Sequence, residues 1–212
     1  MIKAVIFDFD GTLADTKDVM ANAYPKLAKK HGYEVLSMEE LEELKHYPLH
    51  ERIKKLGVPL YKIPILIREG REMVGEFMAT CSYYEGVPAM VHALAEKDLF
   101  LGIISSNSES NIKKFLDAHN LNLFHDIDNT HGLFGKYRVM RRFLKKHGFS
   151  PEEVIYVGDE LRDIENCKKV FIKVIAATWG YDGYDLLKQG EPDYMANEPE
   201  EITSIIEELL SQ

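Results

Sequence analysis

Residues 2–13 have the sequence IKAVIFDFDGTL, a short apolar run that ends in a pair of carboxylates. The run is rich in β-branched residues, which is typical of a buried parallel strand. If the strand geometry continues, Asp8 and Asp10 point to one side and the phenylalanines beside them to the other, because side chains alternate along a strand. Gly11 permits a backbone turn or close approach that a side chain would obstruct. The stretch predicts a strand that delivers two carboxylates to one site.

Three more apolar runs follow along the chain, at Leu99 to Ile104, Val154 to Val157 and Val174 to Thr178, and they alternate with helix-like segments. This alternation predicts an α/β core with a doubly wound parallel sheet, whose ligands sit at the carboxyl ends of the strands. From about Lys17 to Tyr83 the alternation stops and helix follows helix. We therefore expect an α/β core from residues 1–16 and 84–212, with a helical cap domain inserted at residues 17–83.

The composition is that of an ordinary globular protein, with 45% apolar and 29% charged residues among 212. A net charge of −9 disfavours nucleic acids and anionic membranes as partners, because those require a basic surface. The N-terminal apolar run is too short for a signal peptide and no run approaches ~18 apolar residues, so a cytoplasmic location is expected. Cys81 and Cys167, each in an expected helix, are interpreted as reduced packing residues.

The second apolar run ends in hydroxyl groups, at Ser105 and Ser106, with Asn107 beside them. The segment that follows, 108–111, should open a helix, and the free N–H groups of a helix start favour an anion. A strand end, hydroxyl groups and a helix N-terminus together suit phosphate. Simple helix capping is the alternative interpretation.

Two further patches carry charge. Lys136 stands at the start of an expected helix, where a lysine opposes the helix dipole, and this unfavourable placement suggests a functional role. A solvated surface lysine is the alternative interpretation. Asp159 and Asp163 follow the third run and would share one face if a helix begins there. Such hard oxygen ligands suit magnesium, although a carboxylate-rich helix start is the alternative. Taken alone, the pair at Asp8 and Asp10 could bind a metal, share a proton or attack phosphorus.

In this order the four patches resemble the motifs of the haloacid dehalogenase superfamily, specifically its phosphatases with a helical cap after the first motif. The patches concerned are Asp8–Thr12, Ser105, Lys136 and Gly158–Asp163. The segment 178–181, Thr-Trp-Gly-Tyr, also resembles one seen in phosphoglycolate phosphatases. The resemblance covers nearly the whole chain.

The resemblance implies that Asp8 attacks phosphorus and forms an aspartyl phosphate, which splits a slow hydrolysis into two easier steps. It implies that Asp10 protonates the leaving alcohol and then activates water. The expected phosphate-binding residues are Thr12, Ser105, Ser106 and Lys136, of which Lys136 also balances the negative charge. A small phosphorylated metabolite is the implied substrate.

The resemblance also implies a Mg²⁺ cofactor. The expected ligands are Asp8, the backbone carbonyl of Asp10, and Asp159, with Asp163 as a further ligand or an orienting group. Magnesium, Lys136 and helix N-termini would together supply a positive pocket inside an acidic protein.

The substrate implied by the resemblance is phosphoglycolate. A phosphosugar mutase of the same superfamily keeps both aspartates and the cap and is an alternative, whereas the dehalogenases lack an aspartate at the position of Asp10. From another class, a non-catalytic phosphate-binding or receiver-like module is a further alternative. Inside the cap, Lys45, His46 and Arg52 flank a proline break and are candidates for binding a distal acid of the substrate, with a solvated basic edge as the alternative.

Overall fold

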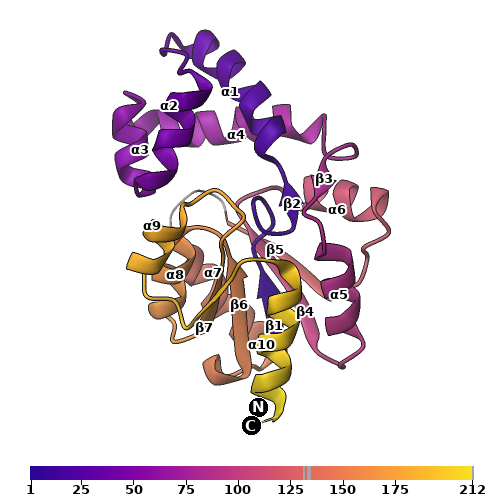
Figure 1. Cartoon of the computed structure of the whole chain (residues 1–212). Helices are drawn as coiled ribbons and strands as arrows, with labels where there is room; N and C mark the ends of the chain where they lie inside the picture. The colour runs from indigo at the N-terminus through magenta and orange to yellow at the C-terminus, as the bar shows by residue number, and fades with distance from the viewer. Residues whose placement is uncertain (131, 133–134, 212) are drawn as a thin grey trace.

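The computed structural model describes residues 1–130, 132 and 135–211, and in this part of the chain a parallel sheet of six strands forms the base (Figure 1). The strand order is β5-β4-β1-β6-β7-β8, and every neighbouring pair is parallel. The strands are β1 (Ala4–Phe7), β4 (Phe100–Ser105), β5 (Asp126–Asn129), β6 (Val154–Gly158), β7 (Lys173–Ala177) and β8 (Tyr194–Ala196). The predicted doubly wound α/β core is confirmed.

Helices cover both faces of the sheet. On one face lie α5 (Val87–Ala95), α6 (Glu109–Ala118) and α10 (Pro199–Ser211), and on the other lie α7 (Lys136–His147), α8 (Leu161–Lys168) and α9 (Tyr184–Gln189).

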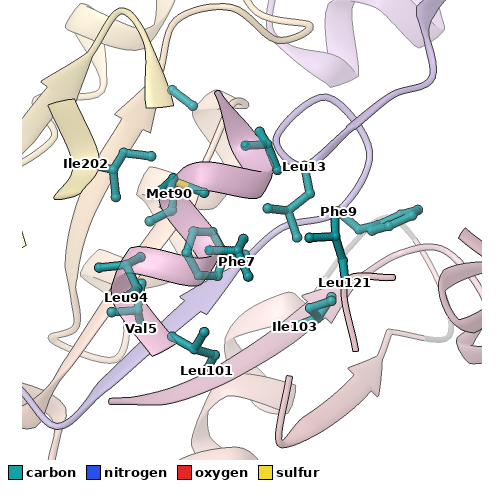
Figure 2. Close-up of a cluster of buried hydrophobic side chains, with 14 of the residues drawn as sticks. Val5, Phe7, Phe9, Leu13, Met90, Leu94, Leu101, Ile103, Leu121 and Ile202 are labelled. Atoms are coloured by element: carbon teal, nitrogen blue, oxygen red, sulfur yellow. The ribbon is translucent and has the colours of Figure 1, made fainter. Parts of the chain in front are cut away.

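Strand β1 shows why the sequence folds in this way, because its side chains alternate between the two helical layers. Val5 and Phe7 pack in the first layer, shown in Figure 2, and Ala4 and Ile6 pack in the second. All four are completely buried, so a strand covered on both faces appears as an unbroken apolar run.

The segment between β1 and α5 forms a group of helices that lies on the side of the sheet where the strands end (Figure 1). It contains α1 (Lys17–His31), α2 (Met38–Glu43), α3 (Leu49–Lys55), α4 (Ile63–Gly75) and the short 3-10 helices Leu44–His46 and Leu60–Lys62. The chain enters through β2 (Ala14–Asp15) and returns through β3 (Ser82–Tyr83), which pair antiparallel. This two-stranded connection lies at the predicted boundaries. The division into a core and a cap domain at residues 17–83 stays a prediction, and the helical segment is called the cap below.

The structure differs from the sequence-based expectations at a few points. Strands β5 and β8, at the two edges of the sheet, were not predicted. Helix α8 begins at Leu161, so Asp159 precedes the helix instead of sharing a face with Asp163. Cys81 lies outside any helix, just before β3, although both cysteines are free and buried as expected. No helix in the described ranges is both long and apolar enough to cross a membrane.

Candidate active site

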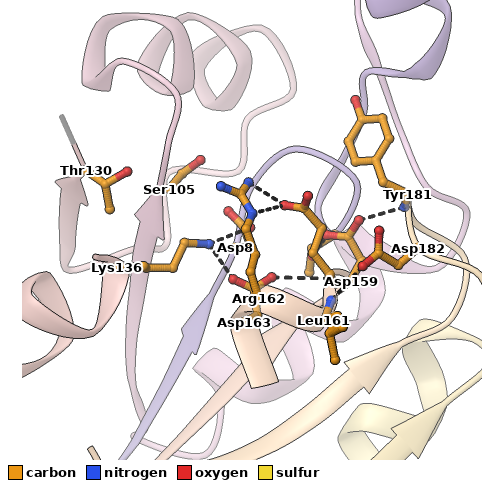
Figure 3. Close-up of polar contacts among 12 residues, drawn as sticks. Asp8, Ser105, Thr130, Lys136, Asp159, Leu161, Arg162, Asp163, Tyr181 and Asp182 are labelled. Atoms are coloured by element: carbon orange, nitrogen blue, oxygen red, sulfur yellow. Dashed lines mark hydrogen bonds and ion pairs between the residues drawn. The ribbon is translucent and has the colours of Figure 1, made fainter. Parts of the chain in front are cut away.

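Asp8 and Lys136 form the centre of the site (Figure 3). Asp8 follows β1 directly, and its Oδ1 accepts a hydrogen bond from the backbone N–H of Phe9 at 2.7 Å. Nζ of Lys136, the first residue of α7, donates to Oδ2 of Asp8 at 2.7 Å, to Oδ1 of Asp163 at 2.6 Å and to the hydroxyl of Tyr156 at 3.0 Å. Burial alone would lower the pKa of Lys136, but the charges of Asp163 and Asp8 raise it above its ordinary value. The lysine is therefore held as a buried cation.

Asp10 lies two residues further along the chain, and its Oδ1 accepts a hydrogen bond from Nδ2 of Asn107 at 3.1 Å. Burial and the nearby charge of Asp8 raise the pKa of Asp10 to about 7, while hydrogen bonds from Asn107 and Thr16 oppose the rise. A carboxyl group that titrates near neutral pH is suited to both donating and accepting a proton.

Asp159 is completely buried at the end of β6. Its Oδ1 accepts a hydrogen bond from the hydroxyl of Thr12 at 2.7 Å, and its Oδ2 accepts one from the backbone N–H of Tyr181 at 2.8 Å. Burial raises the pKa of Asp159 well above its ordinary value, and the charges of Glu160 and Asp8 add to the effect. In this arrangement Thr12 orients a carboxylate, and its predicted contact with phosphate stays a prediction.

The start of α8 brings a further carboxylate to the site. Glu160 is the N-cap residue, and its backbone N–H donates to Oδ2 of Asp163 at 3.4 Å in a capping box. Nε of Arg162 donates to Oε2 of Glu160 at 2.6 Å. One oxygen each from Asp8, Glu160 and Asp163 lies within 4.8 Å of the others, and all three residues are buried.

This carboxylate group tests the predicted metal ligands. It includes Asp8 and Asp163, adds Glu160, and leaves out Asp10 and Asp159. The charges of Asp8 and Glu160 nevertheless act on both of these carboxyl groups. Oxygen-only donors of this kind suit Mg²⁺, which combines a few carboxylates with water and phosphate oxygens. The donor chemistry therefore fits a divalent cation, and the individual ligand set stays a prediction.

The predicted phosphate-binding hydroxyls lie at the end of β4, the strand next to β1. Ser105 is buried, and its Oγ accepts a hydrogen bond from the backbone N–H of Asn107 at 3.1 Å. Figure 3 places the hydroxyl of Ser105 on the same side of Asp8 as Lys136. Ser106 lines the cavity described next. Helix α6 begins just beyond, capped by Ser108, whose Oγ accepts from the backbone N–H of Asn111 at 3.2 Å.

A cavity of about 390 Å³ opens between the sheet and the cap. Asp8, Asp10, Ser106 and Asn107 line its core side. Its remaining wall is formed largely by cap residues, so the two carboxylates face a space large enough for an organic ligand.

Of the three predicted cap residues, Arg52 lines this cavity, and Lys45 and His46 are not among its described lining residues. The guanidinium of Arg52 bonds the Asp182 carboxylate, and its Nε donates to the carbonyl of Tyr47 at 2.6 Å. His46 is exposed. The carbonyl of Lys45 accepts a hydrogen bond from the backbone N–H of residue 183 at 3.1 Å, so this part of the cap rests on the core.

Sequence reasoning missed several residues of the site, namely Arg71, Tyr156, Glu160, Tyr181 and Asp182. Glu160 and Tyr181 lie inside the motif segments 158–163 and 178–181. The motifs therefore indicate that these positions belong to the site, but they do not assign either residue a function. Arg71, on α4, lines the cavity and donates from Nη2 to the carbonyl of Thr130 at 3.0 Å. Nothing local to its helix distinguishes it from the other basic residues of the cap.

Comparisons with known proteins agree with this geometry. The chain is 29% identical over 215 residues to a phosphoglycolate phosphatase from Synechococcus elongatus, a match that covers 100% of both chains. It is 23% identical over 213 residues to a pyrophosphatase PpaX from Bacillus cereus, covering 98% of both. A solved structure of a haloacid dehalogenase-like family hydrolase from Streptococcus pneumoniae superposes with a TM-score of 0.81 at 22% identity, covering 97% of this chain and 98% of the other.

The model of one family, described as haloacid dehalogenase-like hydrolase, matches residues 5–177. That range begins in β1 and ends with β7, and it contains each of the four patches of polar residues and the whole cap. The resemblance noted from the motifs is thereby confirmed: the chain belongs to the haloacid dehalogenase-like hydrolase family, in its phosphatase branch.

Proposed function

We propose that the chain is a magnesium-dependent phosphatase that hydrolyses a small phosphate monoester through an aspartyl phosphate on Asp8. The observation that carries the proposal is the double ion pair of Lys136, whose Nζ contacts Oδ2 of Asp8 at 2.7 Å and Oδ1 of Asp163 at 2.6 Å. This contact fixes a carboxylate at the end of β1, on the wall of a cavity. A carboxylate in such a position is suited to attack a phosphorus atom.

The local charge supports a divalent cation. The five carboxylates around Asp8 are accompanied by the three cations Lys136, Arg162 and Arg71, so this group, fully ionised, has two more negative charges than positive ones. The carboxylates are Asp8, Asp10, Asp159, Glu160 and Asp163. Mg²⁺ held by Asp8, the carbonyl of Asp10, and Asp159, with Asp163 or Glu160 in support, would neutralise part of this charge and that of the substrate phosphate.

The chemistry divides between the two aspartates. In the first step an oxygen of Asp8 forms a bond to phosphorus, the ester bond breaks, and Asp10 gives its proton to the leaving alcohol. In the second step Asp10 takes a proton from a water molecule whose oxygen attacks the phosphorus, which releases inorganic phosphate and restores Asp8. General acid/base help of this kind contributes ~10²- to 10⁴-fold. The raised pKa of Asp10 supports both roles.

Lys136 and the end of β4 are assigned to the phosphoryl oxygens. Lys136 remains a cation beside Asp8, and Ser106 lies on the cavity wall where β4 ends. Ser105 is the neighbouring candidate: its Oγ accepts one backbone hydrogen bond, and its hydroxyl also carries a hydrogen that can be donated. Thr12 donates to Asp159, which favours an orienting role over direct phosphate contact.

A panel of phosphate compounds tests the proposal. The names of the relatives make phosphoglycolate and pyrophosphate the first candidates, and the phosphosugar mutase alternative adds hexose phosphates. We expect magnesium-dependent release of inorganic phosphate from at least one member and from p-nitrophenyl phosphate. A mutase would instead convert a hexose phosphate to its isomer with little phosphate release. A binding module would turn over none of the panel, and that result would overturn the proposal.

A further inference from the structure

The cap side of the active-site cavity is apolar. Ten aliphatic side chains from α1, α3, α4 and the segment between α3 and α4 line it, and we call this set the apolar chamber. Its members are Met20, Leu27, Leu49, Ile53, Leu56, Val58, Ile63, Leu66, Ile67 and Val74. Three of them, Ile53, Ile63 and Val74, are buried, and the other seven retain accessible surface. The chamber is therefore a wall that faces a space, and an occupant would complete its burial.

The apolar chamber and the chemical site belong to one cavity. The same cavity that these side chains line is bounded by Asp8, Asp10 and Ser106. The volume of this cavity is about 390 Å³. It falls in the range of pockets that bind organic ligands, which combine mostly hydrophobic walls with a few polar groups. A phosphate bound at Asp8 would occupy the core end only and leave the chamber to the rest of the substrate.

Arg71 marks the boundary between the two ends. Its Nη2 donates to the carbonyl of Thr130 at 3.0 Å, and among the described residues its buried Nε has no hydrogen-bond partner. Leaving a buried donor unpaired is unfavourable, so an acceptor on the substrate would stabilise this side chain. The other two arginines of the cavity wall are already engaged: Arg52 by Asp182 and the carbonyl of Tyr47, and Arg162 by Glu160. Among the described residues the donor left for a substrate is thus on Arg71, near Asp10, and apart from the engaged Arg52 the cap wall beyond it is hydrocarbon.

We propose that the substrate is a phosphate monoester whose alcohol carries an apolar body, which is buried in the apolar chamber while Arg71 donates to an oxygen near the ester. The inference rests on the proposed phosphatase function and narrows its substrate class. A compact diacid would leave most of the chamber in contact with water and place its charge against hydrocarbon, which is unfavourable. An apolar body gains free energy from the same surfaces.

The test uses the series of straight-chain alkyl phosphates from ethyl to octyl phosphate. The reactivity of the leaving alcohol is nearly constant along this series, so the main variable is the apolar surface that enters the chamber. We expect kcat/KM to rise roughly two- to fourfold per added methylene until the chamber is full. A flat or falling profile, with phosphoglycolate preferred to every longer alkyl phosphate, would overturn the inference and leave the phosphatase function intact. No turnover of any phosphate ester would instead sink the proposed function.

Gly70 offers a way to fill the chamber. It lies inside α4, lines the cavity, and has nothing within 4 Å of the position that a Cβ would take. Gly70→Leu is therefore tolerated by the backbone and projects a side chain into the space. We expect the loss of kcat/KM for octyl phosphate to exceed that for ethyl phosphate by at least tenfold. The matched control is Glu72→Leu, which adds the same side chain at an exposed position of α4 outside the described lining and should leave the chain-length profile unchanged. An equal loss on both substrates in Gly70→Leu would count against the chamber.

Arg71→Met tests the boundary. The substitution removes the donors and keeps the stem apolar, so kcat/KM should fall by a similar factor for every member of the series, because all share the ester end. A loss confined to the longer chains would show that Arg71 contacts the body instead, and would overturn its assignment.

Discussion

Nζ of Lys136 lies 2.7 Å from Oδ2 of Asp8, although 128 positions separate the two residues in sequence. The two ends of this contact belong to different elements, the end of the central strand β1 and the first turn of α7. Asp163 supplies the second carboxylate partner, so the lysine is opposed by two negative charges in a buried place. The contact explains a lysine at a helix start, where the helix dipole alone would disfavour it.

Asp8→Asn should reduce turnover of every substrate by at least ~10³-fold, because the amide keeps the shape but is a poor nucleophile. The measurement is steady-state phosphate release, with melting curves to show that the variant is folded. The control is Asp18→Asn, which removes an exposed carboxylate from α1. Near-normal activity of Asp8→Asn would exclude the covalent mechanism.

Asp10→Asn should impair leaving-group protonation while Asp8 remains able to attack. Because the pKa of Asp10 is raised to about 7, its proton-donating form is present at and below neutral pH and is lost above it. For an alkyl phosphate we expect phosphoenzyme formation in the wild-type protein to fall as pH rises through this region, and the dependence to vanish in Asp10→Asn. An activated aryl phosphate should hide most of the defect. If both substrates lost rate equally, the acid role of Asp10 would be wrong.

Removing divalent cations should abolish activity, and Mg²⁺ should restore it. Calcium should substitute poorly, because its longer and looser coordination displaces the attacking oxygen. Mg²⁺ should also raise the melting temperature of the chelator-treated protein, since the cation offsets repulsion among carboxylates in the folded state alone. Full activity in excess chelator would contradict the metal assignment, and an unchanged melting temperature would count against a cation held by these carboxylates.

Arg52→Ala separates two readings of one residue. The sequence suggests a grip on a distal acid of the substrate, whereas the structure pairs Arg52 with Asp182 across the cap and the core. Since that pairing engages the guanidinium, we expect a similar loss of about 10- to 100-fold in kcat/KM for phosphoglycolate and for an aryl phosphate, the equivalent of about 1.5–3 kcal/mol for a charged hydrogen bond. Asp182→Asn should give the same pattern. A loss confined to phosphoglycolate would favour the distal-acid role.

Glu153 makes stability depend on acid pH at a place far from the chemistry. Its carboxylate bonds Lys3 and the backbone N–H of Ser150, and these contacts lower its pKa from 4.5 to about 2. A group with a lowered folded-state pKa stabilises the protein above its unfolded-state pKa, and the contribution is lost as pH falls toward the folded value. Glu153→Gln should therefore lower the melting temperature at pH 7, with the difference shrinking between about pH 4.5 and pH 2. A constant difference across this range would refute the linkage.

The strands that could be predicted from the sequence are those in the interior of the sheet. The four apolar runs became β4, β1, β6 and β7, which are consecutive in the strand order. The edge strands β5 and β8 were missed for a physical reason. An edge strand is incompletely covered, and β5, with the sequence DIDN, contains a single apolar residue. An apolar run in the sequence indicates a buried segment, so it predicts a strand only where that strand is buried.

The candidate site divides in the same way. Asp8 and Asp10 are adjacent to a buried strand, so their common direction follows from local geometry. Arg71 lines the cavity because α4 lies across the core. The local sequence of the helix does not indicate this tertiary position, so the role of Arg71 could not be predicted. Glu160 lies inside a motif but was passed over for the flanking aspartates, since its placement depends on where α8 begins.

Gly11 shows that the site restricts the size of its side chains as strictly as their charge. Its φ is +81°, and a Cβ there would lie 2.2 Å from Oδ2 of Asp159. A Cβ at Gly180 would come equally close to the same carboxylate oxygen. Neither glycine leaves room beside Asp159 even for a methyl group. In random mutagenesis of this region, these glycines should therefore tolerate substitution as poorly as the aspartates do. Much of the restriction on the sequence of the site should thus fall on residues that take no part in the chemistry.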